Sequence, residues 1–180
     1  MSGPSASATT STSPEAAAAA FNDADVHFTE SMIPHHDQAV EMSKMLLAKR
    51  DANSEVHTLA RQIQAIQEPQ IGIMNQWIET WGKPAGAAHD EGVEDSGPGH
   101  HGGADGLMTE AQMKALDDAT GQTGQKLYLE GMIRHHQGAI AMAEAEMKNG
   151  KYPDAIHLAS GLVEDQNAQI ATMQNLLATL

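Results

Sequence analysis

The chain has 180 residues, with 24 acidic side chains against 10 basic ones and a formal net charge of −14 at pH 7. This charge argues against nucleic acids and anionic membranes as partners, because few cations are available to displace counterions. The absence of cysteine excludes disulfides, thiolate nucleophiles and cysteine-ligated clusters. No apolar run approaches the roughly 20 residues that span a bilayer, so we expect no transmembrane segment. All sulfur is in methionine, and the positions of the 11 Met and 10 His residues become the main question.

Residues 1–21 are small, almost uncharged and without hydrophobic period, which predicts a disordered tail. They contain no apolar core of a signal peptide. A tail of Ser, Thr, Ala and Pro is common just after the cleavage point of exported bacterial proteins, and the missing cysteines agree with export. We therefore expect an extracytoplasmic protein, secreted, periplasmic or at the cell surface, whose signal is not part of this sequence.

Helical patterning dominates the rest of the chain. Two helices are predicted over 23–49 and 54–80, followed by a linker at 82–106 that is rich in Gly, Pro, His and acidic residues. A short helix at 109–119 opens with Thr109 and Gln112 in the spacing of a capping box. Two more long helices are predicted over 124–148 and 154–177.

The two halves of the chain resemble each other. Residues 28–47 and 128–147 share seven identities in twenty at an offset of 100. The likeness continues at an offset of 99, where Leu59, Gln67 and Met74 match Leu158, Gln166 and Met173. A duplicated pair of long helices joined by short turns predicts an all-α fold, an antiparallel four-helix bundle. We expect one domain over 22–180, with repeat one at 22–81 and repeat two at 107–180.

Each first helix of a repeat has a histidine in its apolar stripe. His35 lies in the middle of the first stripe, and His135 takes the same place in the second. His36 and His136 follow about 100° around the helix, still among apolar residues. Methionines lie one turn before each inward histidine and two turns after it: Met32, Met42, Met132 and Met142.

Glutamine interrupts the apolar stripe of each partner helix. Gln70 and Gln169 occupy positions where a bundle would normally place Leu or Ile, and Gln67 and Gln166 precede them by one turn. An unpaired buried polar group costs about 1–3 kcal/mol, so these side chains need partners. The histidines and glutamines could satisfy one another, as a purely structural polar layer, or they could surround a bound ion.

Duplicated His-His pairs flanked by methionine favour the metal interpretation. Imidazole with thioether suits Cu(I), while neutral imidazole also accepts Cu(II) or Zn(II). The candidate copper (alternatively zinc) ligands are His35, His36, His135, His136, Met32, Met42, Met132, Met142 and Asp25. His27 and the linker pair His100-His101 are weaker candidates, and we expect His57, His89 and His157 to be ordinary solvated residues.

These segments resemble the family called domain of unknown function 305. Its hallmark is a duplicated Met-Ile-x-His-His-x-x-Ala-x-x-Met segment, present here as MIPHHDQAVEM and MIRHHQGAIAM. Each copy is followed by a Leu-Ala segment and a Gln-x-x-(Glu/Gln)-Ile-x-x-Met segment, here ending in QEPQIGIM and DQNAQIATM. The resemblance covers about residues 22–180. It implies a ferritin-like bundle, usually exported, in which some members bind copper, and a family without established enzymatic activity.

Three positions depart from the family pattern. Members often carry Glu at the positions of Gln70 and Gln169 and Asp at the position of Gln125, whereas Asp25 is retained in the first copy. Fewer anionic ligands suit a soft Cu(I) site better than a hard cation.

Three functions remain open from the sequence: exported copper sequestration or delivery, a metal-free structural or interaction module of the cell envelope, and a ferritin-like oxidase. The oxidase is disfavoured because no Glu lies three residues before an inward His, as di-iron bundles require. Glu30 and Glu130 lie five residues before His35 and His135, off the inward face. We therefore expect no enzyme. The expected partner is a metal ion, and a homo-oligomer is compatible with the sequence.

Overall fold

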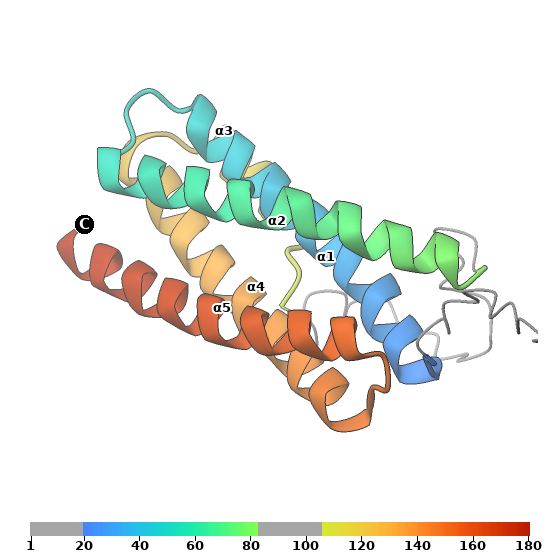
Figure 1. The fold of residues 1–180 in the computed structure, drawn as a ribbon. Helices are drawn as coiled ribbons and strands as arrows, with labels where there is room; N and C mark the ends of the chain where they lie inside the picture. Colours follow the sequence, from blue (N-terminus) through green and yellow to red (C-terminus); the bar gives the residue numbers. More distant parts are fainter. Residues whose placement is uncertain (1–19, 83–105) are drawn as a thin grey trace, which may run out of the picture.

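The computed structural model describes residues 20–82 and 106–180, which contain five α-helices and no strand. Most of the predicted tail and linker, together with His89, His100 and His101, lies outside the described residues. The helices, coloured along the chain in Figure 1, are α1 (Asp23–Ala48), α2 (Ser54–Thr80), α3 (Glu110–Asp118), α4 (Gly121–Asn149) and α5 (Pro153–Thr179).

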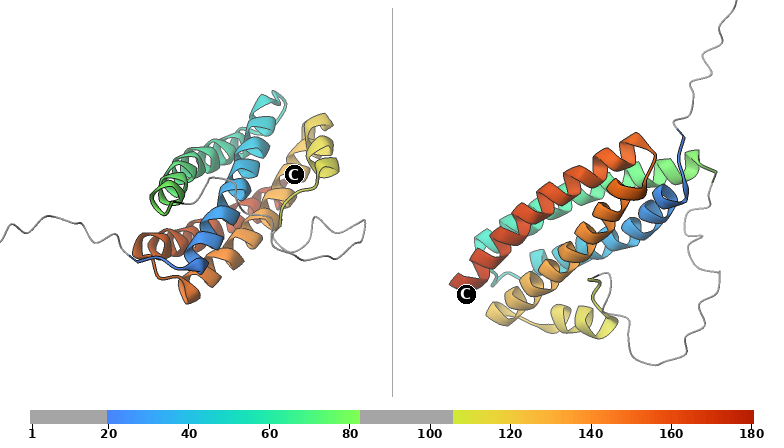
Figure 2. Two further views of the ribbon diagram at one scale, coloured as in Figure 1. Left: turned by 90° about the vertical axis from the view of Figure 1, so that its right-hand side faces the viewer. Right: turned by 90° about the horizontal axis from the view of Figure 1, so that it is seen from below.

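The long helices form two hairpins, α1–α2 and α4–α5, and each hairpin packs extensively within itself. The hairpins meet through α1 and α4 at the centre of the molecule, whereas α2 and α5 lie on the outside and make only sparse contacts with each other (Figure 2). The predicted all-α helical bundle is confirmed. The short α3 packs against α4 and α1.

Side-chain caps set where several helices begin. Asn22 caps α1 in a capping box with Asp25, and Asn53 accepts a hydrogen bond from the Glu55 amide at the start of α2. The predicted capping box of Thr109 and Gln112 is present at α3. Because these caps are local sequence features, the starts of α1, α2 and α3 were predictable to within a residue.

Helix α4 begins at Gly121, three residues before the predicted start at Gly124. The reason is tertiary: the Asp51 carboxylate, in the α1–α2 turn, accepts a 2.6 Å hydrogen bond from the Gly121 amide. Gly121 has φ +57°, a left-handed conformation that glycine adopts without a Cβ penalty. The start of α4 is thus set by a residue 70 positions earlier in the chain.

Two side chains at equivalent places of the repeat join the hairpins at opposite ends of the bundle. Asp25 Oδ1 accepts the amide hydrogens of Lys151 and Tyr152, at 2.9 and 2.8 Å, in the α4–α5 turn. Gln125 Oε1 accepts the amide hydrogen of Asn53, at 2.9 Å, in the α1–α2 turn. The beginning of each central helix therefore holds the turn of the opposite hairpin, as expected when α1 and α4 run antiparallel.

Two apolar clusters form the core. One contains Leu46, Ile63, Leu116 and Tyr128 among others, and the second contains Phe28, Ala143 and Leu162. The first cluster includes four methionines: Met42, Met108, Met132 and Met173. The second includes Met32 and Met74, with Met142 packed against it. The inward histidines belong to neither cluster and are described next.

Candidate metal centre

Four histidines form a buried layer at the crossing of α1 and α4. His35 and His135 are each 1% exposed, and His36 and His136 are fully buried. The rings of His35 and His135 lie against each other, with centroids 3.7 Å apart and planes inclined at 47°. The His135 and His136 centroids are 6.5 Å apart. The structure therefore brings together the two His-His pairs that the sequence placed 100 residues apart.

The second histidine of each pair is held by the interrupting glutamine of its own hairpin. His36 Nε2 lies 2.9 Å from Gln70 Oε1, and His136 Nε2 lies 2.6 Å from Gln169 Oε1. The predicted His–Gln pairing is thus found in both copies. Gln67 and Gln166 are also buried, 2% exposed each, and their Oε1 atoms have no hydrogen-bond partner among the described residues.

Burial keeps the imidazoles of His36, His135 and His136 neutral. It lowers the pKa of His36 to about 3 and that of His136 to about 4, against an opposing contribution from the glutamine hydrogen bonds. Burial, reinforced by the neighbouring imidazoles, also holds the pKa of His135 well below its usual range. Because a metal ion binds the neutral ring, these three histidines need no deprotonation step near pH 7.

The layer fits a soft cation in its donor chemistry. The Nδ1 atoms of His36 and His136 are buried and have no hydrogen-bond partner within residues 20–82 and 106–180. Such orphaned nitrogens are costly without a ligand and are good donors to copper or zinc. No three His, Asp or Glu side chains within residues 20–82 and 106–180 converge as a complete metal site. The histidines alone would thus offer a low coordination number, which thioether sulfur could complete.

The predicted methionine ligands lie on both sides of the histidine layer. Met32 and Met132 are fully buried one helical turn from His35 and His135. Met42 is also fully buried, while Met142 is half-buried, and each lies two turns, about 10 Å, beyond the inward histidine of its own helix. Met42 instead approaches Gly131, one turn before His135 on the facing helix.

Sequence reasoning missed two further methionines in these flanking regions. Met74 and Met173 are fully buried on α2 and α5, one turn after Gln70 and Gln169. Met74 lies in the cluster that contains Met32, and Met173 in the cluster that contains Met132. Their match across the repeat was the signal that could have identified them.

Asp25 is not at the histidine layer. It lies ten residues, about 15 Å along the helix, from His35. Both of its carboxylate oxygens are already engaged: Oδ2 accepts the Asn22 amide and Oδ1 accepts those of Lys151 and Tyr152. The structure therefore gives Asp25 the role of holding the α4–α5 turn, and Gln125 has the equivalent role at the other end.

The remaining polar candidates lie away from the layer. His27 and His157 are exposed, and His57 is half-buried with Nε2 2.9 Å from the Lys49 carbonyl oxygen. Glu130 is exposed and Glu30 is half-buried, so neither carboxylate belongs to the buried layer.

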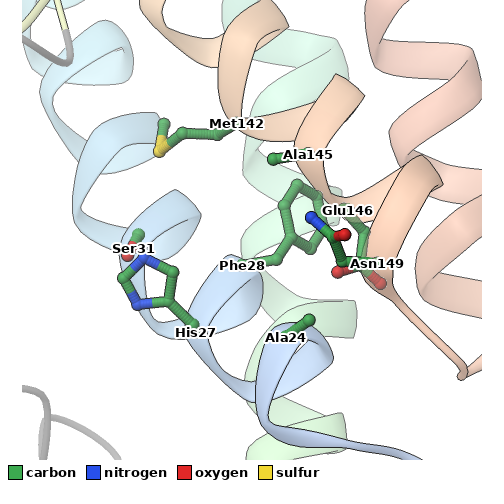
Figure 3. Close-up of a pocket in the computed structure, with 8 residues that line it drawn as sticks. All are labelled: Ala24, His27, Phe28, Ser31, Met142, Ala145, Glu146 and Asn149. Atoms are coloured by element: carbon green, nitrogen blue, oxygen red, sulfur yellow. The ribbon is translucent and has the colours of Figure 1, made fainter.

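His27 lines a separate pocket of about 140 Å³ between the beginning of α1 and the end of α4 (Figure 3). Phe28, Ser31, Met142 and Glu146 contribute to the same walls. Glu146 is 1% exposed beside the Asp25 carboxylate, and burial together with this neighbour raises the pKa of Glu146 to about 8. At neutral pH the pair therefore carries a single negative charge.

The fold and the site together define a class of protein: an all-α bundle in which each of the two central helices brings a histidine pair into one buried layer. A family model described as "Domain of unknown function (DUF305)" matches residues 25–177. The chain belongs to this family, which confirms the family assignment made from the duplicated His-His motifs.

Solved structures share both fold and sequence with this chain. A DUF305 fragment from Deinococcus radiodurans is 30% identical, with a TM-score of 0.75, and covers 88% of this chain and 98% of its own. A Streptomyces coelicolor DUF305 protein, thought to be secreted, is 35% identical, with a TM-score of 0.74, and covers 87% and 91%. No curated protein matches this chain.

A further relative, CopM, has been solved with metal. Its Cu(I)-bound form is 28% identical to this chain, with a TM-score of 0.69, and covers 86% of this chain and 96% of its own. The Cu(II)-bound form gives a TM-score of 0.71 at 29% identity, and CopM has also been solved with silver. None of the helices in the described part of our chain is long and apolar enough to cross a membrane.

Proposed function

We propose that this protein binds copper, preferentially Cu(I), in the buried layer formed by His35, His36, His135 and His136. The observation that carries the proposal is the burial of four imidazoles at one crossing, where the Nδ1 atoms of His36 and His136 have no hydrogen-bond partner among the described residues. A structural polar layer would be expected to satisfy such atoms. The copper-bound forms of CopM support copper as the ion.

Thioether sulfur would complete the donor set. Met32 and Met132 are the nearest candidates because they lie one turn from the inward histidines, and Met42 and Met142 extend the sulfur-rich surroundings. Imidazole with thioether is a soft donor set, so it favours Cu(I) over hard cations, and zinc is the secondary candidate. Asp25 is omitted from this set because its oxygens already accept backbone amides.

The protein would sequester or hand on the ion outside the cytoplasm. Support for export comes from the composition of residues 1–21 and from the Streptomyces coelicolor relative. A cysteine-free donor set suits an oxidising compartment, because thioether and imidazole cannot be lost to disulfide formation.

The test is Cu(I) retention under anaerobic, reducing conditions. Wild type, His35→Ala/His135→Ala and the control His57→Ala/His157→Ala are loaded with Cu(I), desalted and titrated with a colorimetric Cu(I) chelator. The control removes the same number of histidines from outside the layer. We expect wild type and control to retain copper equally, and the layer variant to lose at least about 100-fold in affinity, or ~2.7 kcal/mol.

Equal retention by the layer variant and the control would overturn the proposal and favour the metal-free structural module. Far-ultraviolet circular dichroism of each apo variant verifies folding. If the alanine variant is unfolded, His35→Gln/His135→Gln replaces it, because glutamine keeps polar volume in the layer while removing the imidazoles.

A further inference from the structure

The contact between the second histidine of each pair and its glutamine also determines which ring nitrogen carries the hydrogen. In both hairpins the contact is between imidazole Nε2 and the glutamine Oε1, at 2.9 Å for His36–Gln70 and 2.6 Å for His136–Gln169. An amide oxygen only accepts hydrogen bonds, so Nε2 must carry the hydrogen. In a neutral imidazole the other nitrogen, Nδ1, then holds a free lone pair.

The opposite amide orientation is disfavoured by the surroundings of Nδ1. If the glutamine NH₂ faced Nε2, the ring hydrogen would move to Nδ1. The Nδ1 atoms of His36 and His136 are buried without any acceptor among the described residues. A buried N–H donor without a partner costs about 1–3 kcal/mol and is rare in folded proteins. Both copies of the repeat therefore favour the Nε2–H form.

We propose that Gln70 and Gln169 are positioning residues that lock His36 and His136 as Nε2–H tautomers, so that each ring presents its Nδ1 lone pair to the metal ion. The second part of this inference rests on the proposed function, whereas the tautomer is a property of the apo protein. A metal-ligating histidine commonly donates its other N–H to a fixed acceptor, which orients the ring and sets the tautomer.

The neutral glutamine also bears on which ion is preferred. An amide acceptor orients the ring without adding negative charge to a buried site, whereas a carboxylate in its place would add one charge per copy. The uncharged pair therefore suits a monovalent soft ion such as Cu(I) or Ag(I) better than a divalent one. Gln70 and Gln169 are half-buried, between the histidine layer and the outer surfaces of α2 and α5.

The tautomer is tested on the full chain without metal. Protein labelled with ¹⁵N at histidine is examined at pH 7.5 by long-range ¹H–¹⁵N correlation, which distinguishes Nε2–H from Nδ1–H rings; His36→Gln and His136→Gln assign the signals. We expect the Nε2–H pattern for both rings. In Gln70→Leu/Gln169→Leu this pattern should be lost or mixed, while Gln76→Leu/Gln174→Leu, exposed positions on the same helices, should leave it unchanged.

Silver(I) then serves as a redox-inert, diamagnetic probe of the ligating atom. We expect Ag(I) to shift the Nδ1 resonances of His36 and His136 while Nε2 keeps its hydrogen. Competition with a soluble Ag(I) chelator should show about 10–100-fold weaker binding in the Gln→Leu pair and no change in the control pair.

Four outcomes would count against these statements, and they are distinguishable. An Nδ1–H pattern in the apo protein would overturn the tautomer inference. Loss of the Nε2 hydrogen on silver binding would overturn ligation through Nδ1. Both results would leave metal binding standing. Equal silver affinity in the Gln→Leu and control pairs would overturn the positioning role. A spectrum in which no layer histidine responds to silver would overturn the proposed function and Nδ1 ligation, with the apo tautomer still read independently.

Discussion

Burial of several neutral imidazoles in one layer makes the folded state sensitive to acid. His36, His135 and His136 all have a depressed pKa because of burial, whereas the same side chains in the unfolded chain titrate near 6.5. Between these values the unfolded chain binds more protons than the folded protein, so protons favour unfolding. The stabilising effect of the neutral rings is fully present above pH 6.5 and is lost as the pH falls.

We accordingly predict that the apo protein loses stability steeply below pH 6.5, by about 1.4 kcal/mol per pH unit for each buried histidine. Urea unfolding at a series of pH values from 7.5 to 5 measures the slope. His36→Gln/His136→Gln should have a shallower slope, and His57→Ala/His157→Ala should keep that of wild type. A wild-type slope equal to that of the His→Gln pair would contradict the prediction.

Glu146 responds to pH in the opposite direction. Burial and the neighbouring Asp25 raise its pKa to about 8, above its ordinary 4.5. Stability from this group is therefore fully present below pH 4.5 and is lost as the pH rises through 8. The repeat places fully buried Leu46 at the equivalent position of α1, where no such titration can occur.

Replacement of Glu146 by the residue of the other repeat should remove this alkaline sensitivity. We predict that Glu146→Leu is more stable than wild type by about 1–3 kcal/mol at pH 8.5, with a smaller difference at pH 5. Urea unfolding at pH 5 and at pH 8.5 measures the difference in the free energy of unfolding. Glu144→Leu, at an exposed position one half-turn away, is the control. If the stability difference between Glu146→Leu and wild type were the same at pH 5 and at pH 8.5, Glu146 would not titrate in this range.

At the scale of helices, the bounds of the long elements could be predicted closely, because caps and periodicity are local. The capping boxes of α1 and α3 both involve residues three positions apart. The early start of α4 could not be predicted, because it depends on the hydrogen bond that the Gly121 amide donates to Asp51 of the other hairpin. The role of Asp25 could not be predicted for the same reason. Its place before the histidine motif suggested a metal ligand, and only the fold showed that it accepts hydrogen bonds from the α4–α5 turn.

The contacts of Asp25 and Gln125 with the turns of the opposite hairpins should affect stability but not metal binding. We expect Asp25→Ala to lower the free energy of unfolding by about 1–3 kcal/mol, since three backbone amides lose a buried acceptor. Gln125→Ala removes one acceptor of a backbone amide and should lower the free energy of unfolding by less. Copper retention per folded molecule should be unchanged in both variants. A loss of Cu(I) affinity in Asp25→Ala without loss of fold would return Asp25 to the ligand set.

At the scale of the whole molecule, the histidine layer joins the two halves of the repeat. His35 comes from one hairpin and His135 from the other, and their ring centroids lie 3.7 Å apart. We propose that the layer holds one shared ion, which would link the hairpins across the α1–α4 contact.

A shared ion predicts that single and double substitutions in the layer are not additive. His35→Ala and His135→Ala should each abolish high-affinity Cu(I) retention as completely as the double variant does. Copper stoichiometry by elemental analysis, measured for each desalted variant, provides the comparison. Retention of half the wild-type copper by each single variant would indicate two independent sites instead.

The sequence by itself determined the likeness of its two halves, the four long helices, the inward placement of the His-His pairs and the need of Gln70 and Gln169 for partners. These follow from periodicity and local caps, which are properties of single segments. Only the tertiary structure decided that His35 meets His135, that Nε2 rather than Nδ1 of His36 faces Gln70, and that Asp25 serves a turn. Periodicity fixes which face of a helix is buried, whereas the partner opposite that face depends on how the two hairpins cross.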